Sequence, residues 1–393
     1  MKFESVAANK NNYKWEQMIK REEKLYSSNT DVRSEFQRDY TRILHSTAFR
    51  RLKNKTQVFY APENDNISTR IEHVNYVESI SYTIAQYLGL NTELTRAISI
   101  GHDVGHAPFG HKGGNSLSKI SEREIGNIFW HEKNGLFMVD NIELLEDYEG
   151  NKKNLDLTYA VRDGIISHCG EIDENAIKPR EDAIDLNEYT KPNQYAPYTW
   201  EGCVVKISDK ISYLGRDIED GMRMGILDEH INELYDILGK KINNTIIINK
   251  LVSDLCENSS IDEGLKFSDD ALEMMDKIKA YNYKYIYSSD KLKPSAEYFT
   301  TIIEKIYEIL KECYNGENTA EKLKENTKFY PQLCNNFLEW IQDYWNISDR
   351  NRLKNRILFD IKNPNDYYSA IIYYISGMTD TYAIKMYKEI IHF

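Results

Sequence analysis

Apolar residues that recur at three- and four-residue steps constrain the fold of this chain more than any other feature. In the stretch from Arg70 to Leu88 they form one face of a helix. Thr69 precedes this stretch as a suitable N-cap, and Gly89-Leu90-Asn91 follows it as a break between helices. Strict two-residue alternation is scarce, so the sequence predicts an all-α protein. The residues on the helical spacing are Ile71, Val74, Val77, Ile80, Ile84 and Leu88.

The same periodicity continues through the rest of the chain. It predicts helices through residues 94–104 and 203–218, and in the stretches around residues 229–250, 268–288, 295–314, 331–345 and 365–391. Between Gly170 and Gly202, Pro, Gly, Asn and acidic residues cluster. This composition indicates a long connection between two helices.

The domain organisation follows from length and composition. A chain of 393 residues can build one large core or two modest ones. After about residue 235 the composition shifts to Lys, Asn, Tyr and Ile, and no chemical motif follows. We therefore expect the chemistry in residues 1–235 and a helical C-terminal region, residues 236–393, packed on the same core.

The charge and the termini exclude several classes of protein. A formal net charge of −12 argues against broad neutralisation of a nucleic-acid backbone. Two basic clusters, Arg38–Arg42 and Arg50–Lys53, leave single-stranded DNA as an open alternative partner. Met1–Lys14 has no apolar run of a secretory signal, and no stretch reaches the roughly 18–20 apolar residues of a membrane span. We expect a cytoplasmic protein without a membrane partner.

The cysteines agree with that location. Five cysteines are an odd number, and they are widely spaced without a CxxC motif. This pattern predicts reduced, buried thiols and disfavours both a disulfide framework and a thiolate metal site. The five are Cys169, Cys203, Cys256, Cys313 and Cys334.

The segment from Gly101 to His111 carries the strongest chemical signal. It contains three of the nine histidines, at His102, His106 and His111, together with an aspartate and turn-forming residues. Histidine is a middling helix former and is awkward to bury unpaired, so packing alone does not explain the cluster. Adjacent residues on a helix point about 100° apart, so His102 and Asp103 can reach a metal ion from two sides.

Two further residues can complete a metal site. His73 lies beside the apolar face of the 70–88 helix, where a plain core histidine is the alternative. Asp209 interrupts the apolar stripe of the 203–218 helix, where a surface acid paired with Lys206 or Lys210 is the alternative. Two imidazoles and two carboxylates suit Mn²⁺, Mg²⁺, Fe²⁺ or Zn²⁺ and leave positions for water and phosphate.

These segments together resemble a known family. Ser68–His73, Gly101–His111 and Asp209–Tyr213 resemble the H…HD…D signature of the HD-domain superfamily, in the form found in deoxyguanosine-triphosphate triphosphohydrolases. The resemblance spans roughly residues 35–225 in the expected order. The supporting runs are Arg38–His45 with Phe49–Leu52, Lys55–Phe59, Arg162–Gly170 and Tyr213–Gly221.

The resemblance implies an activity and a ligand set. Members of the family convert a dNTP and water to a deoxynucleoside and inorganic triphosphate. His73, His102, Asp103 and Asp209 match the family's metal ligands. The family usually forms symmetric homo-oligomers, which implies a hexamer or tetramer and dNTPs that act as allosteric effectors as well as substrates.

The resemblance also implies roles for three more histidines. His106, His111 and His131 match the histidines that face the α-phosphate. We assign protonation of the leaving 5′-oxygen to His111, because the reference pKa of histidine lies near neutrality. We assign stabilisation of the transition state to His106 and His131.

The substrate contacts complete the set that the resemblance implies. Arg70 and Lys210 match phosphate contacts, and both side chains suit the charge of a triphosphate. Tyr213 and Asp217 match residues that flank the deoxyribose, where a ring excludes a 2′-hydroxyl and an acid binds the 3′-hydroxyl. Asn54 and Gln57 are our candidates for the lining of the base pocket.

Two departures from the family keep other functions open. The position three after His111 is usually acidic, but here it is Gly114, and Glu132-Lys133-Asn134 replaces the usual residues after His131. Glu132 or another acid could substitute for the missing carboxylate. The alternatives are another HD phosphohydrolase, acting on an alarmone or a cyclic dinucleotide, and a dNTP-binding sensor without turnover.

Overall fold

The computed structural model describes residues 2–23, 31–60, 64–169, 175–239 and 243–392. The chain forms two compact units whose segments alternate along the sequence. Unit 1 comprises residues 1–44, 58–103 and 157–293, and unit 2 comprises residues 45–57, 104–156 and 294–393. The shift in composition near residue 235 predicted a single boundary there, whereas residues 236–293 belong to unit 1 together with the helices that precede them.

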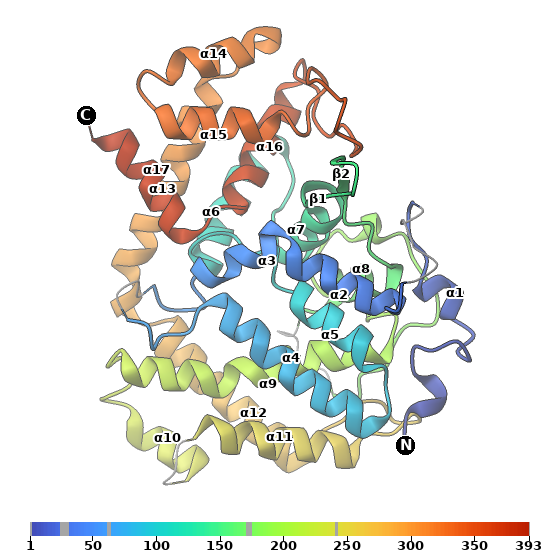
Figure 1. The fold of residues 1–393 in the computed structure, drawn as a ribbon. Coiled ribbons are helices and arrows are strands. Elements are labelled where there is room, and N and C mark those ends of the chain that lie inside the picture. The colour runs from blue at the N-terminus through green and yellow to red at the C-terminus, as the bar shows by residue number, and fades with distance from the viewer. Residues whose placement is uncertain (1, 24–30, 61–63, 170–174, 240–242, 393) are drawn as a thin grey trace. The chain divides into compact units, whose positions relative to one another are not determined.

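The predicted all-α class is confirmed (Figure 1). The helices of unit 1 include the two long helices that the apolar periodicity predicted most clearly, α4 and α9. They are α1 (Trp15–Met18), α2 (Glu35–His45), α4 (Arg70–Leu88), α5 (Thr92–Gly101), α8 (Tyr159–Ser167), α9 (Trp200–Arg223), α10 (Ile231–Leu238), α11 (Asn244–Asn258) and α12 (Asp269–Asn282), which a π-helical turn, η5 (Tyr283–Tyr287), continues. Short 3₁₀ turns are η1 (Glu4–Val6), η4 (Leu186–Glu188) and η6 (Asp290–Leu292).

Unit 2 is also helical and contains one small hairpin. The described residues hold two strands, β1 (Leu144–Glu146) and β2 (Lys152–Asn154), which pair antiparallel with Leu145 opposite Lys153. The helices are α3 (Thr47–Arg51), α6 (Gly110–Ile125), α7 (His131–Phe137), α13 (Lys293–Glu312), α14 (Thr319–Asn326), α15 (Pro331–Ile341), α16 (Pro364–Ser376) and α17 (Asp380–Ile391), with the turns η2 (Leu52–Asn54), η3 (Met138–Ile142) and η7 (Gly316–Asn318).

The ends of α4 show why the sequence predicted this helix so well. Thr69 and Glu72 form a capping box at its start, and the Thr69 N–H donates to Glu72 at 2.6 Å. Gly89 ends the helix in the left-handed region with φ of 86°, which costs a glycine little. Asn91 then caps α5 by accepting from two backbone N–H groups. Local signals therefore set the bounds of both helices.

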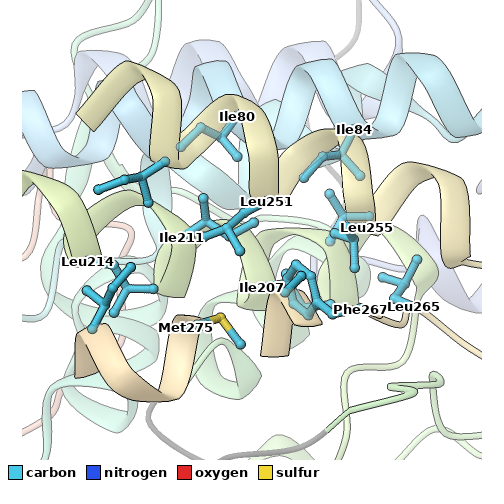
Figure 2. Packing of buried hydrophobic residues seen from close by; sticks show 14 of the residues in the cluster. Ile80, Ile84, Ile207, Ile211, Leu214, Leu251, Leu255, Leu265, Phe267 and Met275 are labelled. Atoms are coloured by element: carbon cyan, nitrogen blue, oxygen red, sulfur yellow. The ribbon is translucent and has the colours of Figure 1, made fainter. Parts of the chain in front are cut away.

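The core of unit 1 consists of apolar faces from helices that pack against one another. Helices α4, α9 and α11 lie side by side (Figure 1), and α12 packs against α9. Burial of each Ile or Leu contributes about 1.5–3 kcal/mol, so this cluster holds the helices in place. Figure 2 shows its members, among them Ile80, Ile84, Ile207, Ile211, Leu214, Leu251, Leu255, Leu265, Phe267 and Met275.

The predicted connection before α9 is largely without helix over residues 175–199, whereas residues 170–174 lie outside the described residues. A buried carboxylate, Asp163, anchors it to α8. Asp163 accepts from the Tyr198 N–H at 2.7 Å and from the Arg180 guanidinium at 2.5 Å. Hydrogen bonds from Arg180 and Tyr198 therefore hold residues 175–199 to α8 within unit 1.

The five cysteines are buried and form no disulfide with any described residue, as their spacing predicted. Within the described ranges, none of the helices combines the length and the apolarity that crossing a bilayer requires.

A close backbone approach in unit 2 leads to the first prediction. A Cβ at Gly105 would lie 2.1 Å from the Gly135 nitrogen and 2.2 Å from the His131 oxygen, whereas a Cβ at Gly114, within α6, meets nothing within 4 Å. We expect Gly105→Ala to lower the free energy of unfolding by about 2–3 kcal/mol, because backbone must move. We expect Gly114→Ala to raise it by about 0.5–1 kcal/mol. Denaturant unfolding of both variants measures the contrast, and equal stabilities would contradict it.

Candidate metal centre

His102 stands at the C-terminal end of α5 with its imidazole oriented by the helix itself. Its Nδ1 lies 2.6 Å from the Ser99 carbonyl oxygen, so the Nδ1–H donates there and Nε2 carries the lone pair. The ring is fully buried, and Nε2 has no hydrogen-bond partner among the described residues. A buried ring nitrogen with an unused lone pair is suited to bind a metal ion.

The other three predicted ligands surround that atom. Nε2 of His102 lies 3.6 Å from Asp103 Oδ1 and 3.9 Å from Asp209 Oδ1. Nε2 of His73 lies 3.0 Å from Asp209 Oδ1 and 3.7 Å from Asp103 Oδ2. Two atoms that are each about 2.1 Å from a common ion are about 3.0 Å apart at a right angle and about 4.2 Å apart when opposite. The spacing therefore fits one ion.

Three helices of unit 1 deliver these ligands. His73 comes from α4, His102 and Asp103 from the end of α5, and Asp209 from α9. The Ser212 hydroxyl donates to the Asp209 carbonyl at 2.9 Å and lies 3.2 Å from His73 Nδ1, which gives the Nδ1–H of that ring an acceptor. His73 thus presents Nε2 to the carboxylates, as His102 does.

The charges of the cluster are paired within it. Burial lowers the pKa of His73, but the hydrogen bond with Asp209 and the charge of Asp103 outweigh burial, and the net shift is upward. Burial raises the pKa of Asp209, but His73 outweighs it, and the net shift is downward. Arg70 donates to Asp103 Oδ2 at 2.8 Å and is itself buried. Arg70, predicted as a phosphate contact, therefore also holds a carboxylate of the cluster.

His168 is a fifth residue of this region, and its sequence context predicted no role for it. Its run, Arg162–Gly170, supported the family resemblance, but nothing in the sequence singled out the histidine. Ligand atoms of His102, His168 and Asp209 all lie within 4.8 Å of one another. Burial and the nearby His102 lower the pKa of His168 to about 4, so its ring is neutral at neutral pH.

The residues predicted at the deoxyribose continue along α9. Asp209, Tyr213 and Asp217 are four residues apart and so share a face of the helix. Asp217 is buried and accepts a hydrogen bond of 2.5 Å from the Tyr287 hydroxyl, which reaches it from η5. Burial raises the pKa of Asp217 to about 7. Tyr287 was not predicted, because it lies far along the chain from any motif. Lys210 is also buried.

The three histidines of unit 2 form a second cluster. The rings of His106 and His131 stack with centroids 3.9 Å apart, and the ring of His111 lies 5.7 Å from that of His106 and nearly perpendicular to it. His131 Nδ1 is 3.3 Å from an oxygen of Glu132, which is almost completely buried. The carboxylate of Glu132 therefore contacts one of these imidazoles.

Asn54 and Gln57 belong to unit 2. Asn54 ends η2 and is exposed, whereas Gln57 is buried. Their contact with a base stays a prediction.

Comparisons with known proteins identify the class of this chain and then its family. Residues 70–214 match the HD domain family. An HD domain is a metal-dependent fold, and the His/Asp cluster that lies within these residues could bind a metal ion. A deoxyguanosinetriphosphate triphosphohydrolase-like protein of Caldanaerobacter subterraneus subsp. tengcongensis is 33% identical over 362 residues, which cover 92% of this chain and 86% of the relative.

Two further relatives carry the same name. The protein of Pelagibacter ubique is 31% identical over 403 residues, which cover 97% of this chain and 100% of the relative. The protein of Clostridium tetani is 30% identical over 369 residues, which cover 92% of this chain and 86% of the relative. The chain belongs to the family of deoxyguanosinetriphosphate triphosphohydrolase-like proteins.

The raised pKa of Asp217 predicts a dependence of stability on pH. The pKa of Asp217 is about 7 in the folded protein, above its ordinary value of 3.8. The folded protein therefore favours the neutral carboxyl, and this contribution to the free energy of unfolding is fully present below pH 3.8. It is lost as the pH rises toward 7, by at most about 1.4 kcal/mol per pH unit. We expect Asp217→Asn to stabilise the metal-free protein more at pH 8 than at pH 5.5. Urea unfolding at both values measures this, with exposed Asp228→Asn as control. A stabilisation that is independent of pH would refute it.

Proposed function

We propose that this protein hydrolyses deoxynucleoside triphosphates, with dGTP as the first candidate, to a deoxynucleoside and inorganic triphosphate. The observation that carries the proposal is the set of short distances that joins His73, His102, Asp103 and Asp209 within the HD domain, together with Tyr213 and Asp217 on the same face of α9 as Asp209. The names of the relatives support the same substrate class. Mn²⁺ or Mg²⁺ is the proposed ion, and Fe²⁺ and Zn²⁺ suit the same ligands.

His73, His102, Asp103 and Asp209 would hold the ion. When bound, a divalent ion supplies Lewis acidity and an activated water at a phosphate. Arg70 and Lys210 add positive charge for the triphosphate, and the guanidinium of Arg70 suits two phosphate oxygens at once. The contact between Arg70 and Asp103 fixes this guanidinium beside the ligands. The chain thus supplies charge on the same helices that carry the cluster.

The proposed sugar contacts would give a preference for deoxynucleotides. The ring of Tyr213 would exclude a 2′-hydroxyl, and the carboxyl of Asp217 would bind the 3′-hydroxyl. The Tyr287 hydroxyl donates a hydrogen bond to Oδ2 of Asp217, and this bond holds the carboxyl in one orientation. We propose that Tyr287 positions Asp217 for the sugar. Asn54 and Gln57 remain our candidates for contacts to the base.

The histidines of unit 2 would protonate the leaving group and stabilise the transition state. Cleavage at the α-phosphorus needs a proton for the departing 5′-oxygen, which we assign to His111. His106 and His131 would stabilise the charge that grows on the phosphate. In place of the acid that the family usually carries at the position of Gly114, we propose that Glu132 orients the imidazole of His131.

The resemblance also supports a proposal for assembly and location. We propose a cytoplasmic homo-oligomer, a tetramer or hexamer, in which dNTPs act as effectors as well as substrates. Light scattering with and without dNTP tests the assembly, and a monomer under both conditions would refute it.

The activity is tested with the purified chain, each of the four dNTPs, GTP, and Mn²⁺ or Mg²⁺. We expect triphosphate and deoxynucleoside from dNTPs, at least about 10²-fold less product in Asp103→Asn and His111→Ala, and unchanged turnover in Asp228→Asn. Chromatography resolves the products. Pyrophosphate or monophosphate as product would indicate another HD phosphohydrolase, for which alarmones and cyclic dinucleotides are the next substrates. Thermal stabilisation by dNTP without product would indicate a sensor.

The role of Glu132 gives a separate prediction. Glu132→Gln keeps the size of the side chain and removes the charge beside His131, so we expect kcat to fall about 10²-fold with little change in KM. Because the position of Gly114 has open space, Gly114→Glu in the same background is expected to restore part of kcat. Steady-state kinetics of the single and double variants measure both effects. A rise in KM alone, or no rescue, would argue against an orienting role.

A further inference from the structure

His102 and His168 have the same position at the end of a helix and the same hydrogen bond to its backbone. His102 is the C-cap residue of α5 and His168 is the C-cap residue of α8. Each Nδ1 lies 2.6 Å from the carbonyl oxygen of the residue three positions earlier, Ser99 and Ile165 respectively. Both rings are almost completely buried. Two helices of unit 1 that pack against each other thus end in the same local arrangement.

This arrangement decides which nitrogen of each ring faces the cluster. A ring that donates its Nδ1–H to a carbonyl keeps the lone pair on Nε2. The rings meet edge to face, with centroids 4.9 Å apart and planes at 81°. The ligand atoms of His102, His168 and Asp209 lie within 4.8 Å of one another, so His168 faces the atoms assigned to the metal.

We propose that His168 is a fifth protein ligand of the metal centre, beside His73, His102, Asp103 and Asp209. The proposal rests on the metal centre of the proposed function but not on its substrate. The ligand atoms of His73, His102 and Asp103 form one group within 4.8 Å and those of His102, His168 and Asp209 form another, so His102 belongs to both groups and we assign both to one ion. Three imidazoles and two carboxylates would then surround that ion and leave one position of a six-coordinate shell open for the water, while Arg70 and Lys210 supply the positive charge for the triphosphate.

The surroundings of His168 favour a cation. The C-terminal ends of α5 and α8 both reach the cluster, and a helix carries partial negative charge at that end. A neutral imidazole adds a donor without adding charge to the two carboxylates. A third nitrogen ligand also favours Mn²⁺, Fe²⁺, Co²⁺ or Zn²⁺ over Mg²⁺, which prefers oxygen ligands.

A purely structural role for His168 is the competing explanation, because its Nδ1–H also satisfies a carbonyl at the end of α8. Two substitutions separate the roles. His168→Asn keeps an N–H donor near the position of Nδ1 and removes Nε2. His168→Gln reaches toward the position of Nε2 and loses the donor to Ile165. A structural role predicts damage mainly from His168→Gln, and a ligand role predicts weaker metal binding in His168→Asn.

Calorimetric titration of the metal-free full chain with Mn²⁺, Co²⁺ and Mg²⁺ provides the test. We expect His168→Asn to weaken Mn²⁺ and Co²⁺ binding about 10–100-fold, to change Mg²⁺ binding less, and to leave the melting temperature of the metal-free protein near that of the parent. Ser167→Ala serves as the neighbouring control and Asp209→Asn as the variant that removes an assigned ligand. Parental affinities in His168→Asn would overturn the proposal. If Asp209→Asn also bound the metals with parental affinity, the assignment of the metal centre itself would be wrong.

A measurement without any variant covers the case in which His168→Asn does not fold. Pulsed electron paramagnetic resonance of the Mn²⁺-loaded parent counts the coordinated imidazole nitrogens. Three nitrogens support His168 as a ligand, since His73 and His102 account for two. Two nitrogens would overturn the proposal.

Discussion

The burial of charged groups inside a helical core is the constraint on which unit 1 depends. A buried carboxylate is costly unless it is paired, and here Asp103 accepts from Arg70 while Asp209 lies beside His73. The apolar faces of α4 and α9 bring these groups together, and the polar contacts then orient them. Packing sets the positions of the helices and pairing sets the rotamers, so the geometry of the cluster needs both.

The parts of the fold that could be predicted are those with local signals. Helix α4 has the bounds that Thr69 and Gly89 indicated, because capping and the left-handed turn act within a few residues. The stretch 365–391 was predicted to be helical, and it is: it forms α16 and α17, because Gly377 ends the first helix and Thr379 caps the second. The division into two interleaved units depends on contacts between distant segments, and composition carries no record of them.

In the candidate site too, residues in sequence motifs could be predicted and residues brought in by tertiary packing could not. The four predicted ligands stand in motifs whose residue types and spacing already indicate metal chemistry, and the structure brings them within 3.9 Å or less of a neighbouring ligand atom. His168 and Tyr287 lie in segments without such a motif. Each reaches the site only because α8 packs against α5 and because η5 packs against α9. Their positions are consequences of tertiary packing, which one sequence does not reveal.

In the histidine cluster of unit 2, we propose that the role of the missing acid passes to another position. Packing around the first side-chain atom does not force the absence of an acid at residue 114, because a Cβ there would meet nothing within 4 Å. Glu132 lies at the start of α7, where the partial positive charge of a helix N-terminus favours a carboxylate, and it contacts His131. His131 in turn stacks on His106. What the proposed chemistry requires is a carboxylate against one member of a coupled set of imidazoles, and a neighbouring helix can supply it as well as α6.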